Sequence, residues 1–173
     1  MTALSTTQAP VNFQVPAGFT PVDLTVSPAG RAAAVRAGLP AVPGVDDVVA
    51  RHEEFAQGLL ASRACYGAVF MLPPRRPAYF AITEPDGAPA DLAALAARLP
   101  GDVRPVELPC GPALTCTEHV RLPGEPALVQ EHAFVDHPAG RVVVFTLGVQ
   151  DGERRAADAH LFAEILSTVS FTA

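Results

Sequence analysis

Lysine and tryptophan are both missing from this chain, whose 12 basic residues are all arginine. Without lysine, Schiff-base chemistry on a side-chain amine and the lysine of a phosphate-binding loop are excluded. Adjacent basic residues occur only at Arg75–Arg76 and Arg154–Arg155, on a chain with a net charge of -6. Because nucleic-acid binders neutralise phosphates with clustered cations, we expect no nucleic-acid partner.

Cysteine is scarce, and the 3 cysteines leave one unpaired under any disulfide scheme. This number favours a reducing compartment. Residues 1–10 contain neither a cation nor an apolar run of the kind that a signal peptide needs. No apolar run approaches the roughly 18 residues that a membrane-spanning helix requires. We therefore expect a cytoplasmic protein without a membrane span.

Motifs that would indicate catalysis are also missing. Cys110 and Cys116 flank Gly111-Pro112 with a spacing that suits neither a metal knuckle nor a redox pair. There is no Gly-x-Ser-x-Gly elbow to present a nucleophilic serine. We predict no catalytic residue, no metal ligand set and no cofactor.

Apolar periodicity indicates an alternation of helices and strands. Helices are predicted at 28–37, 46–62, 89–99 and from 158 onward, where the stripe through Phe162 and Ile165 must lie on a sheet. The apolar stripe of 46–62 includes Leu60 and favours His52 as a hydrogen-bonded histidine at the edge of the core, and the inward positions of 89–99 include Leu92, Leu95 and Leu99. Strands are predicted at 11–15, 64–72, 78–84, 103–108, 113–122, 128–136 and 141–148. The short links between strands favour antiparallel neighbours. The fold class is therefore α+β, an antiparallel sheet of about six strands flanked by helices. We expect a flexible tail over 1–10 and a single domain over 11–173.

Several segments together resemble a group of small actinobacterial proteins with a PsbP-like α/β/α sandwich fold. They are Val-Pro-Ala-Gly-Phe at 15–19, Asp-Leu-Thr-Val-Ser-Pro at 23–28, Gly-Ala-Val-Phe at 67–70, Pro-Val-Glu-Leu-Pro-Cys-Gly-Pro at 105–112 and the segment 162–171. Members usually carry tryptophan where this chain has Phe19. The resemblance implies a non-catalytic binding or accessory module, with some members encoded near secretion gene clusters. It implies no shared active-site residue.

Two histidines on neighbouring predicted strands, His119 and His132, form the first candidate binding site. If residues 123–126 close a hairpin, we expect one face to carry Thr117, His119, Arg121, Gln130 and His132 and the other face to carry Glu118 and Glu131. Zinc requires three or four protein ligands, and no third ligand is evident, so a metal site is not predicted. The alternatives are a solvated polar face, a proton-relay or metal site, and a face that binds a partner.

The proline-flanked pair Arg75–Arg76 forms a second candidate binding site, because proline stiffens the segment that presents the two guanidiniums. It could dock an acidic partner or simply solubilise a hairpin loop. We therefore predict a binding or accessory module that engages a protein partner through the polar sheet face or this loop, with the partner's identity unknown. The alternatives are a small metal-dependent or hydrolytic enzyme using the His119/His132 face, and a structural subunit of a larger assembly, including a homo-oligomer.

Overall fold

The centre of the molecule is a seven-stranded sheet in a computed structural model of the chain. The structure describes residues 2–4 (backbone), 11–39, 43–70, 77–84, 91–121, 127–150 and 156–171. The strands follow the order β3-β4-β5-β9-β8-β7-β6, and every neighbouring pair is antiparallel. Their bounds are Thr20–Pro21 (β3), Ala64–Phe70 (β4), Ala78–Thr83 (β5), Arg104–Leu108 (β6), Gly111–Val120 (β7), Leu128–His137 (β8) and Arg141–Gln150 (β9). The α+β class and the antiparallel sheet are confirmed.

A second, three-stranded sheet is formed by β1 (Thr2–Leu4), β2 (Val11–Phe13) and β10 (Ser170–Phe171). Both β1 and β10 pair antiparallel with β2. Within the tail predicted over 1–10, only this β1 backbone is described, and both the flexible tail and the single domain over 11–173 stay predictions. The side chains of Val11 and Phe13 belong to the same buried cluster as the main sheet, so this small sheet closes one side of the core.

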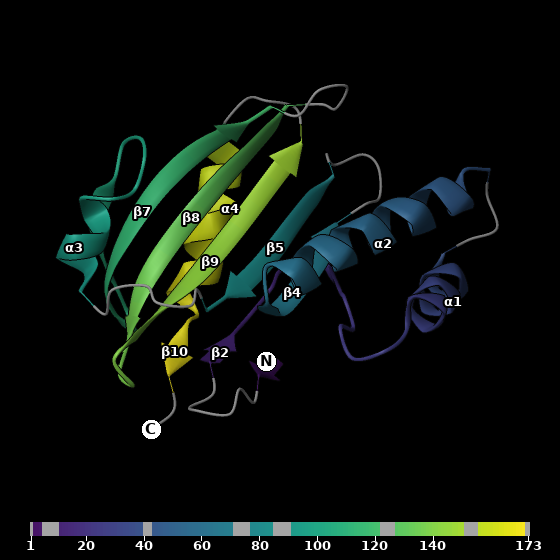
Figure 1. The fold of residues 1–173 in the computed structure, drawn as a ribbon, viewed down its shortest axis with the longest axis horizontal. Helices are drawn as coiled ribbons and strands as arrows, with labels where there is room; N and C mark the ends of the chain where they lie inside the picture. The colour runs from purple at the N-terminus through teal and green to yellow at the C-terminus, as the bar shows by residue number, and fades with distance from the viewer. Residues whose placement is uncertain are drawn as a thin grey trace.

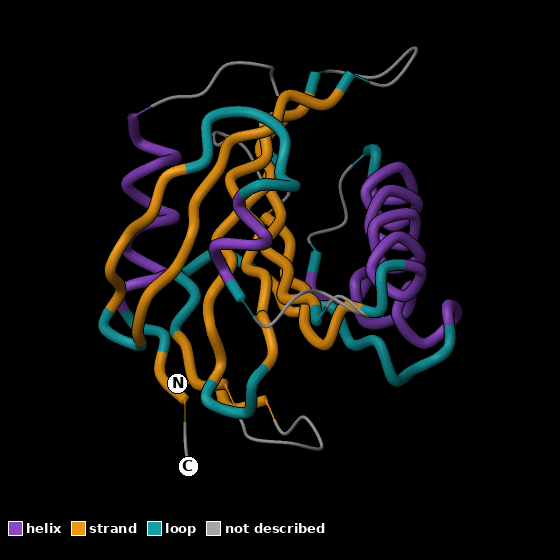
Figure 2. Tube along the Cα trace, turned by 60° about the vertical axis from the view of Figure 1, so that its left-hand side comes forward, coloured by secondary structure: helices purple, strands orange, loops and turns teal. Residues whose placement is uncertain are grey.

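One face of the main sheet is covered by α4 (Ala156–Ser167). The buried side chains Phe162, Ile165 and Leu166 pack into a cluster with Phe80 of β5 and Phe145 of β9. Figures 1 and 2 show α4 along this face, on the side of the sheet away from α1 and α2. The helix predicted from 158 onward therefore lies on the sheet, as its apolar stripe requires.

Two helices cover separate parts of the opposite face. The long helix α2 (Val45–Ala61) packs on β4 and β5 through Ala56 and Leu59. A Cβ on Gly67 of β4 would lie 2.1 Å from Leu59 Cδ1, so the glycine allows the close approach of this helix. At the other end, α3 (Leu92–Ala96) packs Leu95 against β7 and β9. The middle of this face lies between the two helices (Figure 1).

The helix limits differ from prediction in two places. The helix predicted over 89–99 is helical only at α3, because Arg98 N donates to Leu95 O and tightens the chain into a turn; residues 89–90 lie outside the described part. Leu60, predicted to join the buried stripe of α2, is 42% exposed. Helix α1 (Pro28–Gly38) begins as predicted, with Ser27 Oγ accepting from Gly30 N at 3.3 Å.

Candidate binding site on the sheet

The β7–β8 register places the two candidate histidines on opposite faces of the sheet. His132 is directly opposite Cys116, whereas His119 is directly opposite Val129. Residues that oppose each other share a face and successive residues alternate, so His132 shares its face with Glu118 and not with His119. The predicted grouping of His119 with His132 is therefore wrong. A register shift of one residue separates the predicted pairing from the observed one, and such a shift reverses the faces.

His132 is the best-defined polar group on the face shared by α2 and α3. Its Nδ1 lies 3.0 Å from Thr146 Oγ1 on β9, and its Nε2 lies 3.6 Å from Glu118 Oε2 on β7. The His132 side chain is 16% exposed. Burial lowers the pKa of His132, against the opposing influence of Glu118. The imidazole is therefore neutral at neutral pH and offers one donor and one acceptor.

Tyr79 extends this polar set across two more strands. It stands opposite Gly148 of β9, and a Cβ on Gly148 would lie 2.1 Å from the Tyr79 ring, so the ring lies over the glycine. Across β9, Gln130 Nε2 of β8 donates a hydrogen bond to the Tyr79 hydroxyl oxygen. The centroid of the Tyr79 ring is 4.8 Å from that of the Phe55 ring in α2. Burial raises the pKa of Tyr79, so its phenol stays protonated.

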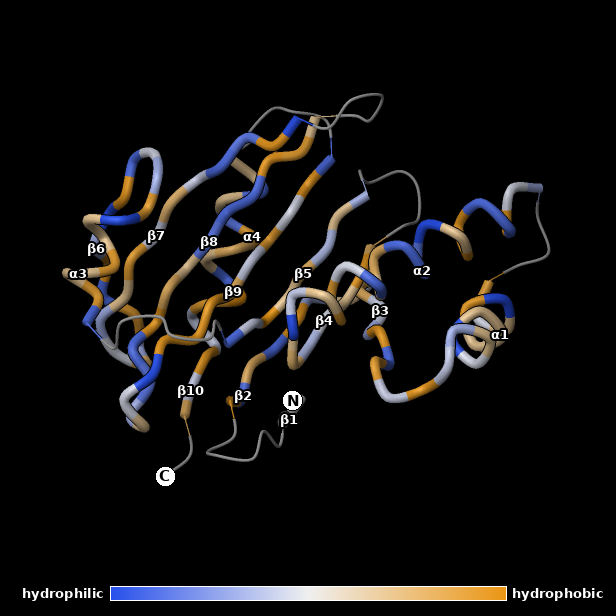
Figure 3. The backbone as a smooth tube through the Cα atoms, viewed as in Figure 1, coloured by the Kyte–Doolittle hydropathy of each residue, from blue (hydrophilic) through white to orange (hydrophobic). Residues whose placement is uncertain are grey.

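We call these five residues the open strip: Tyr79, Glu118, Gln130, His132 and Thr146. They lie on β5, β7, β8 and β9 between α2 and α3 (Figure 1). Burial alternates residue by residue along β8, because one face of this strand is core and the other carries the strip. Figure 3 shows both hydrophilic and hydrophobic stretches along this strand. A cavity of about 320 Å³ adjoins the strip, between the residues that follow α3 and the side of the sheet with Cys116 and His132.

None of the three cysteines, all of them described, is an activated nucleophile. Burial raises the pKa of the Cys116 thiol, and it raises the pKa of Cys65 to about 11. Cys65, Cys110 and Cys116 are all free, and burial also raises the pKa of Cys110. Thiols of this kind are protonated at neutral pH and react slowly. The strip can therefore donate and accept hydrogen bonds, with the Glu118 carboxylate as its one charged group.

The remaining predicted binding residues lie elsewhere. Arg75 and Arg76 fall in 71–76, outside the described residues. His119 is exposed on the other face, and Arg121 is exposed just after β7. A binding role for each of the five predicted residues stays a prediction. In the described ranges, no group of three or more histidine, cysteine, aspartate or glutamate residues could hold a metal ion, and no helix is both long and apolar enough to cross a bilayer.

Sequence reasoning missed two polar contacts that link distant segments. Arg31 of α1 pairs with Glu53 of α2, and Arg141 of β9 pairs with Glu84, which follows β5. Neither pair has a spacing that periodicity could detect. Tyr79 was predicted only as part of a strand. By contrast, His52 was predicted at the edge of the core from its place in the apolar stripe of α2, and it is 5% exposed.

Comparison with known proteins gives a structural similarity at low sequence identity. No family model and no curated protein matches the chain. Among solved structures, it is similar to LpqN of Mycobacterium tuberculosis, a protein involved in cell envelope biogenesis, at 16% sequence identity and a TM-score of 0.47. The similarity covers 94% of this chain and 83% of LpqN.

Proposed function

We propose that this chain is a non-catalytic binding module that engages a protein partner through the open strip. The observation that carries the proposal is a set of polar side chains, two pairs of them hydrogen-bonded, on the part of the sheet that lies between α2 and α3 among the described residues. The Tyr79–Gln130 and His132–Thr146 contacts hold these groups in fixed positions across three strands. Fixed side chains lose little conformational entropy when a partner binds.

The composition of the strip supports a protein partner. Tyrosine is enriched in protein interfaces, because it offers a large rigid surface and a polar end. Glu118, which is 51% exposed, supplies a charge at the β7 side that can select a partner with a complementary cation. The proposal includes three further parts. The partner belongs to a secretion system, as the family resemblance implies, Arg75 and Arg76 dock an acidic partner, and the protein is located in the cytoplasm.

The enzyme alternative depended on His119 and His132 acting together, and the two lie on opposite faces. An enzyme could still use His132 together with Glu118, whose Oε2 lies 3.6 Å from His132 Nε2. Zinc binding would require a third ligand from outside this pair. Metal analysis of the pure protein, with a thermal shift on adding zinc, tests this alternative: a stoichiometric metal or a stabilising shift would favour it over the binding module.

Site-specific photo-cross-linking in cells that express the protein tests the proposal. A photoreactive amino acid replaces Glu118 in the strip and, as the matched control, Glu54, an exposed residue of α2. We expect a discrete heterologous adduct from position 118 and none from position 54. Replacing Gln130 with alanine should reduce the adduct, because it releases the Tyr79 ring. Equal adducts from both positions, or none from 118, would overturn the proposal.

The same cross-linking experiment distinguishes binding of a different protein from homo-oligomerisation. An adduct of twice the monomer mass, together with a dimer or larger species in size-exclusion chromatography with light scattering, would favour a structural subunit instead. A monomer in solution would count against that alternative.

Replacing Arg75 and Arg76 with glutamate should leave folding intact. A loss of the adduct without a loss of stability would therefore assign this arginine pair to the interface.

A further inference from the structure

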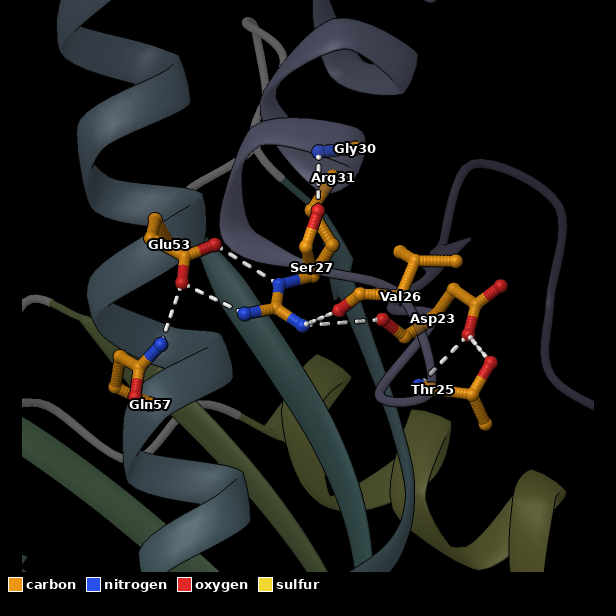
Figure 4. A network of polar contacts seen from close by, with 8 residues as sticks. All are labelled: Asp23, Thr25, Val26, Ser27, Gly30, Arg31, Glu53 and Gln57. Atoms are coloured by element: carbon orange, nitrogen blue, oxygen red, sulfur yellow. Dashed lines mark hydrogen bonds and ion pairs between the residues drawn. The ribbon is translucent and has the colours of Figure 1, made fainter.

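Helix α1 is attached to the fold through a charged residue. Of its eleven residues, all described, Arg31 alone is buried, and its side chain is 3% exposed. Arg31 Nε and Nη2 donate to the two carboxylate oxygens of Glu53 at 2.9 and 2.7 Å (Figure 4). Arg31 Nη1 donates to Val26 O at 2.6 Å and to Asp23 O at 3.5 Å. The guanidinium therefore ties α1 to α2 and to the segment that precedes α1.

Because α1 is held by this polar contact and not by an apolar stripe, space remains beside it. A cavity of about 310 Å³ lies between α1, α2 and the edge of the sheet at β3 and β4. Its apolar lining includes Val26, Val35, Leu39, Val48 and Val69. A volume of this size is at the lower end of the range of small-molecule sites, which is roughly 300–1,000 Å³.

The polar side chains of the lining are those of Thr20, which is exposed, and of Asp23, Arg31 and His52. The Arg31 guanidinium is occupied by Glu53 and by two carbonyl oxygens, so it offers no free cation to an anionic ligand. The exposed Asp23 carboxylate accepts hydrogen bonds from Thr25 N at 2.9 Å and Thr25 Oγ1 at 2.6 Å. An anion that entered the cavity would meet this carboxylate without a compensating positive charge, and a cation would lose its hydration among apolar side chains.

His52 is the buried polar residue of the lining whose ring makes no hydrogen bond with the described residues. The residue is 5% exposed, and its ring nitrogens are not among the fully enclosed, unbonded atoms of the described part, so they can be reached from the cavity. Burial lowers the pKa of His52, with Glu53 opposing and Arg31 reinforcing the shift. Buried polar groups in native proteins are almost always hydrogen-bonded, to protein, to water or to a ligand. A neutral imidazole in the wall of an apolar cavity can bond one polar group of a ligand.

We propose that this cavity binds a small uncharged molecule that has an apolar chain and one hydroxyl, carbonyl or amide group, which hydrogen-bonds to His52. The site is separate from the open strip, and the inference goes beyond the proposed function. Apolar contact with the valines and with Leu39 supplies affinity, and His52 fixes the orientation of the ligand.

Three probes of equal chain length and different charge test the inference: 1-hexanol, hexanoate and hexylammonium. Binding at neutral pH is followed by titration with two-dimensional NMR of the backbone amides. We expect saturable shifts with 1-hexanol, confined to residues of α1, α2 and β4, and binding of the two charged probes that is weaker by about tenfold or more. Shifts that never saturate, shifts centred on Gln130 and Gly148, or equal binding of a charged probe would each overturn the proposal.

Two variants assign the contacts. Val35→Phe should fill the cavity and abolish 1-hexanol binding, whereas Ala33→Phe, at an exposed position of the same helix, should leave it unchanged. His52→Phe keeps an aromatic ring but removes the hydrogen bond, and should weaken 1-hexanol binding by about tenfold. Circular dichroism verifies that each variant is folded. If Val35→Phe is folded and still binds 1-hexanol as the unmodified chain does, the cavity is not the site; if Val35→Phe fails to fold, unchanged binding by His52→Phe would overturn the proposal.

Discussion

The ring of Tyr79 lies over the backbone of Gly148, its directly opposed neighbour on β9. Any side chain larger than hydrogen at position 148 would occupy the space of this ring, since an added Cβ would be 2.1 Å from Tyr79 Cε1. The glycine therefore allows Tyr79 to extend over β9 and accept the hydrogen bond of Gln130. The hydrogen bond between Tyr79 and Gln130 therefore links β5 to β8 across β9.

We predict that Gly148→Ala destabilises the protein by about 1–3 kcal/mol, because the ring must move off its position and the Gln130 bond breaks. Urea unfolding measures the free energy. The matched control is Gly58→Ala in α2, where an added Cβ meets nothing within 4 Å. That change should stabilise the protein by about 0.5–1 kcal/mol, because alanine favours a helix. Equal effects of the two substitutions would contradict the described position of Tyr79.

Glu53→Gln should loosen α1 without unfolding the sheet. The substitution leaves the buried Arg31 guanidinium without its counter-charge, and an uncompensated buried charge is strongly unfavourable. We expect the backbone amides of α1 to exchange with deuterium roughly tenfold faster while those of β8 and β9 are unchanged.

Glu54→Gln is the matched control, since Glu54 is the next residue of α2 and is exposed. It should leave the exchange of α1 unaffected. A Glu53→Gln variant with wild-type exchange in α1 would show that the ion pair does not hold this helix.

The same pair makes the attachment of α1 sensitive to acid. The hydrogen bonds from Arg31, reinforced by Gln57, lower the pKa of Glu53 from 4.5 to about 2. A carboxyl group with a lowered pKa in the folded state contributes stability above its unfolded pKa and loses it as the pH falls. Protection of the α1 amides should therefore decline between about pH 4.5 and pH 2.

Arg104 similarly lowers the pKa of Asp102. The loss of global stability at acid pH therefore reflects the protonation of several carboxylates and not of Glu53 alone. Exchange must therefore be measured residue by residue. In Glu53→Gln the protection of α1 should be low at every pH in this window. A decline in that variant as steep as in the unmodified protein would assign the acid sensitivity to another group.

Phe162→Ala should cost about 3–5 kcal/mol of unfolding free energy, because the ring is 4% exposed in the α4 cluster and its removal leaves a cavity. Urea unfolding monitored by circular dichroism provides the measurement. His160→Ala, at an exposed position of the same helix, should change the free energy by about 0.5 kcal/mol at most. A cost below about 1 kcal/mol for Phe162→Ala would place α4 off the sheet.

Local patterns in the sequence were sufficient to predict most helices and strands. The start of α1 is indicated by Ser27 and Pro28, because Ser27 caps the amide of Gly30 only three residues away. Strand β9 is indicated by its run of valines. In both elements the residues that determine the structure are neighbours along the chain. The inward side of α3 was also predicted, since Leu92, Leu95 and Leu99 are spaced for one helical face. These interactions span a few residues and need no knowledge of the fold.

The candidate site could not be predicted in the same way. The faces of His119 and His132 depend on the strand register, and the sequence pattern allowed a register one residue away from the observed one. The contact of Tyr79 with Gly148 depends on β5 pairing with β9, strands that are far apart in the chain. His52 was predicted as a hydrogen-bonded histidine at the edge of the core, but the cavity that it lines forms only when α1 docks on α2.

The sequence by itself determined which segments are helices and strands, the antiparallel class of the fold and the apolar faces that had to be buried. Hydrophobic periodicity and secondary-structure propensity depend only on residues that are close along the chain. Tertiary structure alone decided the order of the strands, the face on which each histidine lies and the pairing of Arg31 with Glu53. Each of these depends on chain segments that meet only after folding, where sterics and the burial of charge select one arrangement among several that local patterns permit.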